Sequence, residues 1–149
     1  MRSPKDFLRS FKENGLRITP QRRLIIELLV NNSSHPSVDD IYQQAREIMP
    51  GISRSTIYNT MNELAIIGGV LNLGDFIEGS ARFDANTEPH HHLYCEKCHR
   101  IFDIMEGTNA MEIDHESLVG FKIRSSQVTF YGICPECQKN EGNGGGKSS

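Results

Sequence analysis

Four cysteines occur as two pairs with two residues between the members of each pair, Cys95 with Cys98 and Cys134 with Cys137. Two such Cys-x-x-Cys knuckles supply four thiolates, the ligand set of a closed structural zinc site. Free thiols or a redox pair are the alternatives, and two knuckles in series favour zinc over both. Because 35 residues separate the knuckles, the intervening chain must fold as a subdomain that brings them together.

The stretch CEKCH, residues 95–99, also matches the attachment signature of a c-type haem, with His99 as an axial ligand. That interpretation requires export to an oxidising compartment, which the N-terminal sequence does not support, and it leaves the second knuckle unexplained. We therefore expect His99 to be a surface residue beside a zinc knuckle.

Three histidines precede the first knuckle, and they indicate a second kind of site. In a strand, His90 and His92 share one face and His91 lies on the other. If the chain reverses symmetrically about residues 97 and 98, His92 lies opposite Asp103. Two imidazoles and a carboxylate would form a nitrogen and oxygen site suited to Fe(II), Mn(II) or Zn(II). The alternative is a solvated loop, because runs of histidine bind metals promiscuously.

Charge is distributed unevenly along the chain. The net charge is −3, yet residues 1–30 carry seven Lys or Arg and only three Asp or Glu. A locally basic segment attracts a DNA backbone, although a solvated helix face would carry the same charges. The chain contains no apolar run long enough to span a membrane and no secretory signal, so we expect a cytoplasmic protein.

Three helices, over residues 19–32, 37–49 and 53–69, are predicted to position the basic part of the chain. Each begins at a Ser or Thr suited to an N-cap, and each carries apolar residues at helical spacing. Two short strands, VLNLG (70–74) and ARFD (81–84), would follow as a hairpin. This order predicts a helix-turn-helix with a wing, and the third helix would be the recognition helix.

Amide and hydroxyl side chains on the third helix are suited to contact bases and phosphates in a major groove. A polar face that is merely solvated is the alternative. The candidate DNA-binding residues are Arg22, Arg54, Ser55, Thr56, Tyr58, Asn59 and Asn62. Between the two knuckles we predict a strand (100–105), a helix (about 108–118) and a long strand (121–133).

Residues 5–138 resemble the ferric uptake regulator family, because several long motifs occur in the family's order. These motifs are LRITPQR (16–22), HPSVDDIY (35–42), SRSTIYNTMNEL (53–64), ARFD (81–84), HHHLYCEKCHRIFD (90–103) and YGICPEC (131–137).

The resemblance implies an α+β fold with a winged-helix DNA-binding domain (1–84), a hinge (85–88) and an α/β dimerisation domain (89–138) containing the structural zinc. Residues 139–149 would be a disordered tail. The resemblance also implies a regulatory metal site that adds two ligands to those found by spacing; the full set is His35, Asp84, His90, His92 and Asp103.

Two positions place the chain nearest the peroxide-sensing branch of that family. Asp103 stands where iron-uptake regulators usually have Glu, and Asn59 stands where they more often have Arg. The implied protein is a homodimeric repressor of a pseudo-palindromic DNA operator, not an enzyme. It would carry Fe(II) or Mn(II) and release DNA after oxidation of His35 or His90. An iron- or zinc-level sensor of the same fold, or a non-haem metal enzyme, are the alternatives.

Overall fold

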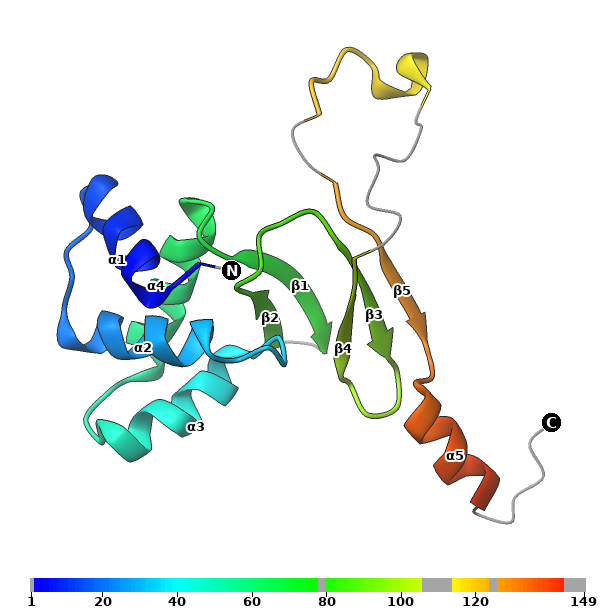
Figure 1. The fold of residues 1–149 in the computed structure, drawn as a ribbon, viewed down its shortest axis with the longest axis horizontal. Coiled ribbons are helices and arrows are strands. Elements are labelled where there is room, and N and C mark those ends of the chain that lie inside the picture. Colours follow the sequence, from blue (N-terminus) through cyan, green and yellow to red (C-terminus); the bar gives the residue numbers. More distant parts are fainter. Residues whose placement is uncertain (1, 78–79, 106–113, 124–125, 144–149) are drawn as a thin grey trace. The chain divides into compact units, whose positions relative to one another are not determined.

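The computed structural model of the protein describes residues 2–77, 80–105, 114–123 and 126–143. The chain forms two compact units, Met1–Thr87 and Glu88–Ser149 (Figure 1). The described residues of the first form four helices and a β-hairpin, and those of the second form a three-stranded sheet, a 3-10 turn and a C-terminal helix. The predicted α+β class, a winged helix followed by a small α/β domain, is confirmed.

Each helix of the first unit begins where a side chain caps it. The bounds are α1 (Pro4–Glu13), α2 (Pro20–Val30), α3 (Val38–Ile48) and α4 (Arg54–Ile66). The three predicted caps are confirmed: Thr19, Ser37 and Ser53 each accept a hydrogen bond from the backbone N–H three residues later. Helix α1 was not predicted, although Ser3 and Asp6 form a capping box at its start.

An apolar core holds these helices together, and it reaches from Phe7 of α1 to Phe83 of the hairpin. Helix α4 contributes the predicted stripe of Ile57, Met61 and Leu64, all fully buried. The opposite face of α4 is thereby left for solvent or a partner. The helix ends before Gly68, which takes a positive φ of 74° and donates its N–H to the carbonyl of Ala65.

The hairpin of β1 (Leu71–Ile77) and β2 (Ser80–Asp84) confirms the two predicted wing strands. Its strands are antiparallel, with Leu71 opposite Asp84, and bulges interrupt the register twice. Asp84 is the last residue of β2, so its position is set by the strand pairing. This matters because Asp84 is a predicted metal ligand.

The second unit is built around a sheet in the order β4–β3–β5. Strands β3 (His91–Cys95) and β4 (Ile101–Ile104) are antiparallel and flank the first knuckle, while β5 (Thr129–Gly132) runs parallel to β3. A 3-10 turn, η1 (His115–Leu118), precedes β5, and helix α5 (Pro135–Asn143) follows it. The second knuckle spans the start of α5, so the strand and the helix together place its cysteines.

Three predicted boundaries differ from the structure. Of the strand expected over 121–133, residues 124–125 lie outside the described residues, and the described part forms a strand only over Thr129–Gly132, which pairs with His92–Cys95 of β3. The helix expected at about 108–118 falls largely on 106–113, outside the described residues, and its end forms η1. The tail was expected to be disordered from 139, but α5 continues to Asn143, with Glu141 ion-paired to Lys97.

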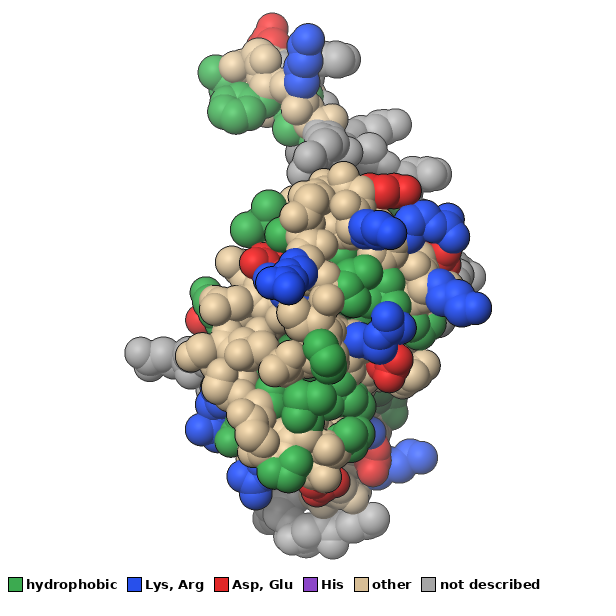
Figure 2. All heavy atoms as spheres, turned by 90° about the vertical axis from the view of Figure 1, so that its left-hand side faces the viewer, with side chains coloured by type: hydrophobic (Ala, Val, Ile, Leu, Met, Phe, Trp, Pro, Cys, Tyr) green, Lys and Arg blue, Asp and Glu red, His purple; other side chains and the backbone are tan. Residues whose placement is uncertain are grey.

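The surface gives a mixed electrostatic picture. On the face shown in Figure 2, Lys and Arg side chains are scattered among Asp and Glu side chains and do not form one continuous basic field. No helix among the described residues is long and apolar enough to cross a membrane.

Candidate metal centres and nucleic-acid interface

The four cysteine sulfurs converge in the second unit. Every pair of Sγ atoms in the cluster lies within 4.8 Å, and the pairs Cys95–Cys137 and Cys98–Cys134 are each 3.8 Å apart. A disulfide would require about 2.05 Å. Tetrahedral zinc with Zn–S bonds of about 2.3 Å places neighbouring sulfurs about 3.8 Å apart. The donor set and its spacing therefore fit zinc, and each knuckle's thiols face the other knuckle as the predicted zinc site requires.

Hydrogen bonds favour the thiolate form at one end of this cluster. Backbone N–H groups of Cys98 and Cys134 lower the pKa of the Cys95 thiol to about 6. Hydrogen bonding from Arg100 lowers the pKa of the Cys98 thiol. The pKa of Cys137 is raised to about 12, chiefly by hydrogen bonding with the Cys134 sulfur. A metal ion bound by all four sulfurs would displace the remaining thiol protons.

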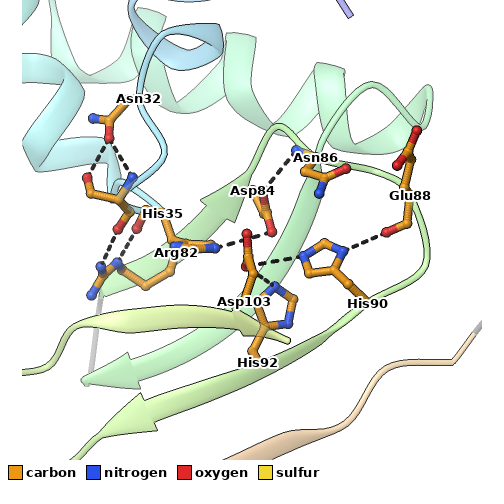
Figure 3. Close-up of polar contacts among 10 residues, drawn as sticks. Asn32, His35, Arg82, Asp84, Asn86, Glu88, His90, His92 and Asp103 are labelled. Carbon is orange, nitrogen blue, oxygen red and sulfur yellow. Dashed lines mark hydrogen bonds and ion pairs between the residues drawn. The ribbon is translucent and has the colours of Figure 1, made fainter. Parts of the chain in front are cut away.

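A second convergence of donors lies on β3, on β4 and at the residue just before β3 (Figure 3). His92 pairs with Asp103 in the β3–β4 register, as predicted. The Nε2 atoms of His90 and His92 lie 3.3 and 3.5 Å from the same oxygen, Oδ1 of Asp103. Both imidazoles are almost fully buried. Two nitrogens and a carboxylate aimed at one point suit a borderline divalent metal.

One backbone contact prepares His90 for that role. Its Nδ1 lies 2.6 Å from the carbonyl oxygen of Glu88. A carbonyl only accepts, so Nδ1 carries the proton and donates it, which leaves the lone pair on Nε2. Metal-binding histidines are commonly oriented by such an outer hydrogen bond.

His91, in the run before the first knuckle, and His99, directly after that knuckle, make other contacts. His91 lies on the opposite side of β3, as expected from strand alternation, and its Nδ1 accepts the backbone N–H of Val128 at 3.2 Å. His99 adopts a positive φ of 62° in the knuckle turn and forms a 2.7 Å hydrogen bond with the Tyr94 hydroxyl. Both contacts tie the sheet and the knuckle together.

The first unit holds a further imidazole and carboxylate in contact. Nε2 of His35 lies 3.3 Å from Oδ2 of Asp84, and both side chains are buried. Oδ1 of Asp84 accepts the backbone N–H of Asn86 at 2.9 Å, which turns Oδ2 toward the histidine (Figure 3). Sequence spacing alone did not find these two residues, since 49 positions separate them.

The backbone of His35 is strained, and Arg82 holds it in place. His35 has a positive φ of 58° immediately before Pro36, a combination that few non-glycine residues adopt. Arg82 donates Nε–H to the His35 carbonyl at 2.5 Å and Nη2–H to the Ser34 carbonyl at 3.1 Å. The sequence did not predict this contact of Arg82, although the residue lies in the quoted ARFD motif.

The predicted recognition helix presents its polar face outward. A groove of about 720 Å³ lies between α4 and the hairpin, lined among others by Ser55, Tyr58, Asn59 and Asn62. Arg54, at the first position of the helix, donates to Asp39 at 2.9 Å and lies 4.4 Å from the Tyr42 ring centre. Thr56 is half-buried, and its backbone N–H is capped by Ser53. All of these predicted residues lie at or beside one groove.

Arg22 is placed differently from the other candidate DNA-binding residues. Its guanidinium forms a 2.8 Å ion pair with Glu63 of α4 and donates to the Arg17 carbonyl at 2.5 Å. It also lies 5.7 Å from the Phe11 ring centre. These contacts join three helices of the first unit. The positive charge of Arg22, which we expected to contact a DNA phosphate, is instead paired with Glu63.

Comparisons with known proteins identify the family of this chain. The family model described as the ferric uptake regulator family matches residues 13–131. The peroxide operon regulator of Bacillus subtilis is 39% identical over 138 residues, covering 92% of this chain and 94% of the regulator. The peroxide-responsive repressor PerR of Staphylococcus epidermidis is 38% identical over 93% of this chain and 92% of its own length.

Solved structures extend the likeness to the fold. A structure of PerR from Streptococcus pyogenes, described in terms of peroxide sensing and gene regulation, is 31% identical with a TM-score of 0.53, covering 93% of this chain and 95% of that one. The ferric uptake regulator of Helicobacter pylori is 23% identical with a TM-score of 0.70, over 92% and 95%. The chain belongs to the ferric uptake regulator family.

Proposed function

We propose that this protein is a metal-dependent transcriptional repressor that senses peroxide. The observation that carries the proposal is the convergence of His90 and His92 on Oδ1 of Asp103, with His90 oriented by the Glu88 carbonyl. Relatives named as peroxide regulators over nearly the whole chain support the same conclusion. The cellular setting is the cytoplasm.

In this proposal, one regulatory metal ion is bound by ligands from both units. His35 and Asp84 come from the first unit, and His90, His92 and Asp103 come from the second. A metal held by all five fixes one orientation of the DNA-binding unit on the dimerisation unit. Binding then favours the orientation that matches DNA, which is allosteric coupling in the thermodynamic sense.

A bound Fe(II) ion would supply the electron for the reduction of peroxide at the site that His35, Asp84, His90, His92 and Asp103 would form. The protein itself places oxidisable imidazoles beside the metal and holds them in fixed positions. We place the oxidation at His35 and His90 because the chain resembles the peroxide-sensing branch of the family, and because a strong oxidant formed at this site attacks the metal ligands that it meets first. An oxidised imidazole loses donor strength, the two units are no longer held together, and the repressor leaves DNA. The four cysteines hold a separate, structural zinc.

DNA is recognised through the groove of the first unit. Arg54, Ser55 and Thr56 lie at the start of α4, where helix dipole and N–H groups favour phosphate, and Tyr58, Asn59 and Asn62 face base edges. We omit Arg22 from the direct contacts because Glu63 and the Arg17 carbonyl hold its guanidinium. A homodimer would place two such helices on a pseudo-palindromic operator.

The alternative roles differ from this one in what the second metal does. A metal-level sensor of the same fold would respond to occupancy alone and not to peroxide. A non-haem enzyme also uses two histidines and a carboxylate, but the relatives are named as regulators.

Metal analysis combined with DNA binding tests the proposal. The purified protein should retain about two zinc ions per dimer after chelator treatment, one for each cluster of four thiolates. DNA binding should be lost on removal of the other metal and restored by Fe(II) or Mn(II). An Asp103→Ala variant serves as the control and should hold zinc without recovering DNA binding. Strong, specific DNA binding by the protein stripped of its second metal would contradict metal dependence.

A further inference from the structure

Arg100 bridges the two knuckles through sulfur. It lies two residues after Cys98, and its Nε donates to Sγ of Cys98 at 3.3 Å. Its Nη2 lies 3.7 Å from Sγ of Cys134, in the second knuckle. One guanidinium thus contacts one sulfur from each knuckle, while the contacts to Cys95 come from backbone N–H groups, such as that of Cys134 at 3.3 Å.

The guanidinium is held in this position from two further sides. Glu136, in the first turn of α5, forms an ion pair with Nη2 of Arg100. The Phe102 ring centre lies 5.4 Å from the guanidinium carbon. The planar fork of Arg can serve several partners at fixed angles, which the point charge of Lys cannot do. These contacts therefore hold the Arg100 guanidinium in one position, from which it donates hydrogen bonds to two sulfurs.

We propose that Arg100 protects the zinc thiolates from oxidation, acting selectively on Cys98 and Cys134. The proposal rests on the assignment of the four cysteines to zinc. Four thiolates on one zinc ion carry two excess negative charges, so their sulfurs are electron-rich and nucleophilic. A charge-assisted hydrogen bond draws electron density from the sulfur and must weaken as the sulfur gives up its charge. The barrier to oxidation rises at the two sulfurs that Arg100 contacts.

The reaction that Arg100 slows is the attack of a thiolate on hydrogen peroxide. Sulfur forms a bond to one peroxide oxygen, the O–O bond breaks, and the departing hydroxide takes up a proton to become water. Sulfur loses two electrons and becomes a sulfenic acid, while the peroxide is reduced. A second thiolate can then displace the sulfenic hydroxide and close a disulfide, which removes two ligands from zinc.

Such protection has a use in a protein that meets peroxide as its signal. Release from DNA by oxidation of the second site leaves the fold of the second unit intact, whereas loss of zinc would not. An oxidation-resistant zinc site therefore keeps the signal at the histidines and preserves the assembly that carries it.

The test compares zinc-loaded, iron-free full-length variants treated with hydrogen peroxide and a sulfenic-acid trapping reagent. Initial rates are measured for each cysteine peptide by mass spectrometry, and zinc release is followed with a coloured chelator. Arg100→Gln removes the donor, and Arg100→Lys keeps the charge without the fork. Lys97→Gln is the matched control, because Lys97 lies in the same knuckle and its ammonium pairs with Glu141.

In Arg100→Gln, oxidation of Cys98 and Cys134 should accelerate about tenfold, equivalent to about 1.4 kcal/mol in the barrier, with a smaller change at Cys95 and Cys137. Arg100→Lys should lie between this variant and the wild type, and Lys97→Gln should match the wild type. Equal acceleration in Lys97→Gln, or an unchanged pattern in both Arg100 variants, would overturn the proposal.

If Arg100→Gln fails to retain zinc, Arg100→Lys decides alone, and an unchanged order of cysteine oxidation there refutes protection. A wild-type protein that contains no zinc would instead refute the four-thiolate assignment itself.

Discussion

Arg82 is one of the residues that hold the segment of His35, an imidazole of the proposed regulatory site. The strained backbone of His35 (φ 58°) persists because Arg82 donates to its carbonyl and to that of Ser34. Without these bonds the segment before Pro36 should relax toward extended conformations. His35 would then turn away from Asp84.

Arg82→Ala should therefore weaken binding of the regulatory metal by about 10- to 100-fold, the range typical for loss of an outer-sphere contact. Competition with a fluorescent chelator measures the affinity for Mn(II). Arg23→Ala, which removes an exposed arginine of α2, is the control and should bind Mn(II) normally. Unchanged affinity in Arg82→Ala would show that His35 is held by other means or is not a ligand.

In the proposed mechanism, Asp103 is the residue that tunes the reactivity of the regulatory metal site. Its Oδ1 faces both His90 and His92, so a change in the reach of this carboxylate alters the coordination around any bound metal. Asp103→Glu should keep metal-dependent DNA binding but lower sensitivity to peroxide. DNA-binding titrations before and after graded peroxide doses measure both properties. A variant as sensitive as the wild type would remove Asp103 from the role of tuning residue.

Among the helices, we expect the orientation of α4 to depend on an ion pair between α2 and α4 that the sequence alone does not predict. Arg22 of α2 contacts Glu63 of α4 at 2.8 Å, and both side chains are less than a third exposed. If the pair is structural, Arg22→Gln and Glu63→Gln should each lower the free energy of unfolding by about 1–2 kcal/mol. Denaturant titrations of both variants test this expectation.

The same two variants decide whether Arg22 touches DNA. A phosphate contact would make Arg22→Gln lower the salt dependence of binding by about one unit of slope, and Glu63→Gln would leave binding intact or strengthen it. We expect both variants to lose affinity together with little change of slope. If Arg22→Gln has normal stability but a reduced slope of the salt dependence of DNA binding, Arg22 contacts DNA directly after all.

The second unit depends on its two knuckles, because the described strands of its sheet have only four or five residues each. Zinc binding to four thiolates contributes about 10–16 kcal/mol of apparent free energy in small zinc domains. Cys134→Ser should consequently lose zinc and the dimer. Ser126→Ala, outside the knuckles, should lose neither, as zinc analysis and sedimentation would show. A zinc-loaded, dimeric Cys134→Ser protein would contradict the four-thiolate site.

At the scale of the whole molecule, local sequence patterns predicted the helices and one strand pairing, whereas contacts between distant segments were harder to predict. N-caps and apolar stripes gave α2, α3 and α4, and symmetric reversal of the chain about residues 97 and 98 gave the pairing of His92 with Asp103. Both follow from rules that act over a few residues.

Features that depend on tertiary contacts could not be read in this way. His35 and Asp84 meet only because Arg82 and the strand β2 bring distant segments together, and family resemblance was needed to name them. The roles of Arg22 and Arg100 depend on partners 41 and 34 residues away in the chain. Helix α1 is a different case, because it does not depend on distant contacts. Its capping box and the spacing of Phe7 and Phe11 are local signals from which the helix could have been predicted.

In the proposed mechanism, one oxidisable metal site couples the two units. Iron and manganese separate its chemical part from simple occupancy, because Mn(II) should support DNA binding yet not readily give an electron to peroxide. An oxidant formed beside buried imidazoles should modify these before exposed side chains such as Met105, which is 52% exposed.

The most direct measurement is peptide mass spectrometry of the Fe(II) and Mn(II) forms after brief peroxide exposure, with DNA binding followed in parallel. We expect one added oxygen on the His35 or His90 peptide of the iron form alone, increasing in step with the loss of DNA binding. An iron form that releases DNA with both histidines unmodified, or that keeps its DNA through peroxide treatment, would contradict it.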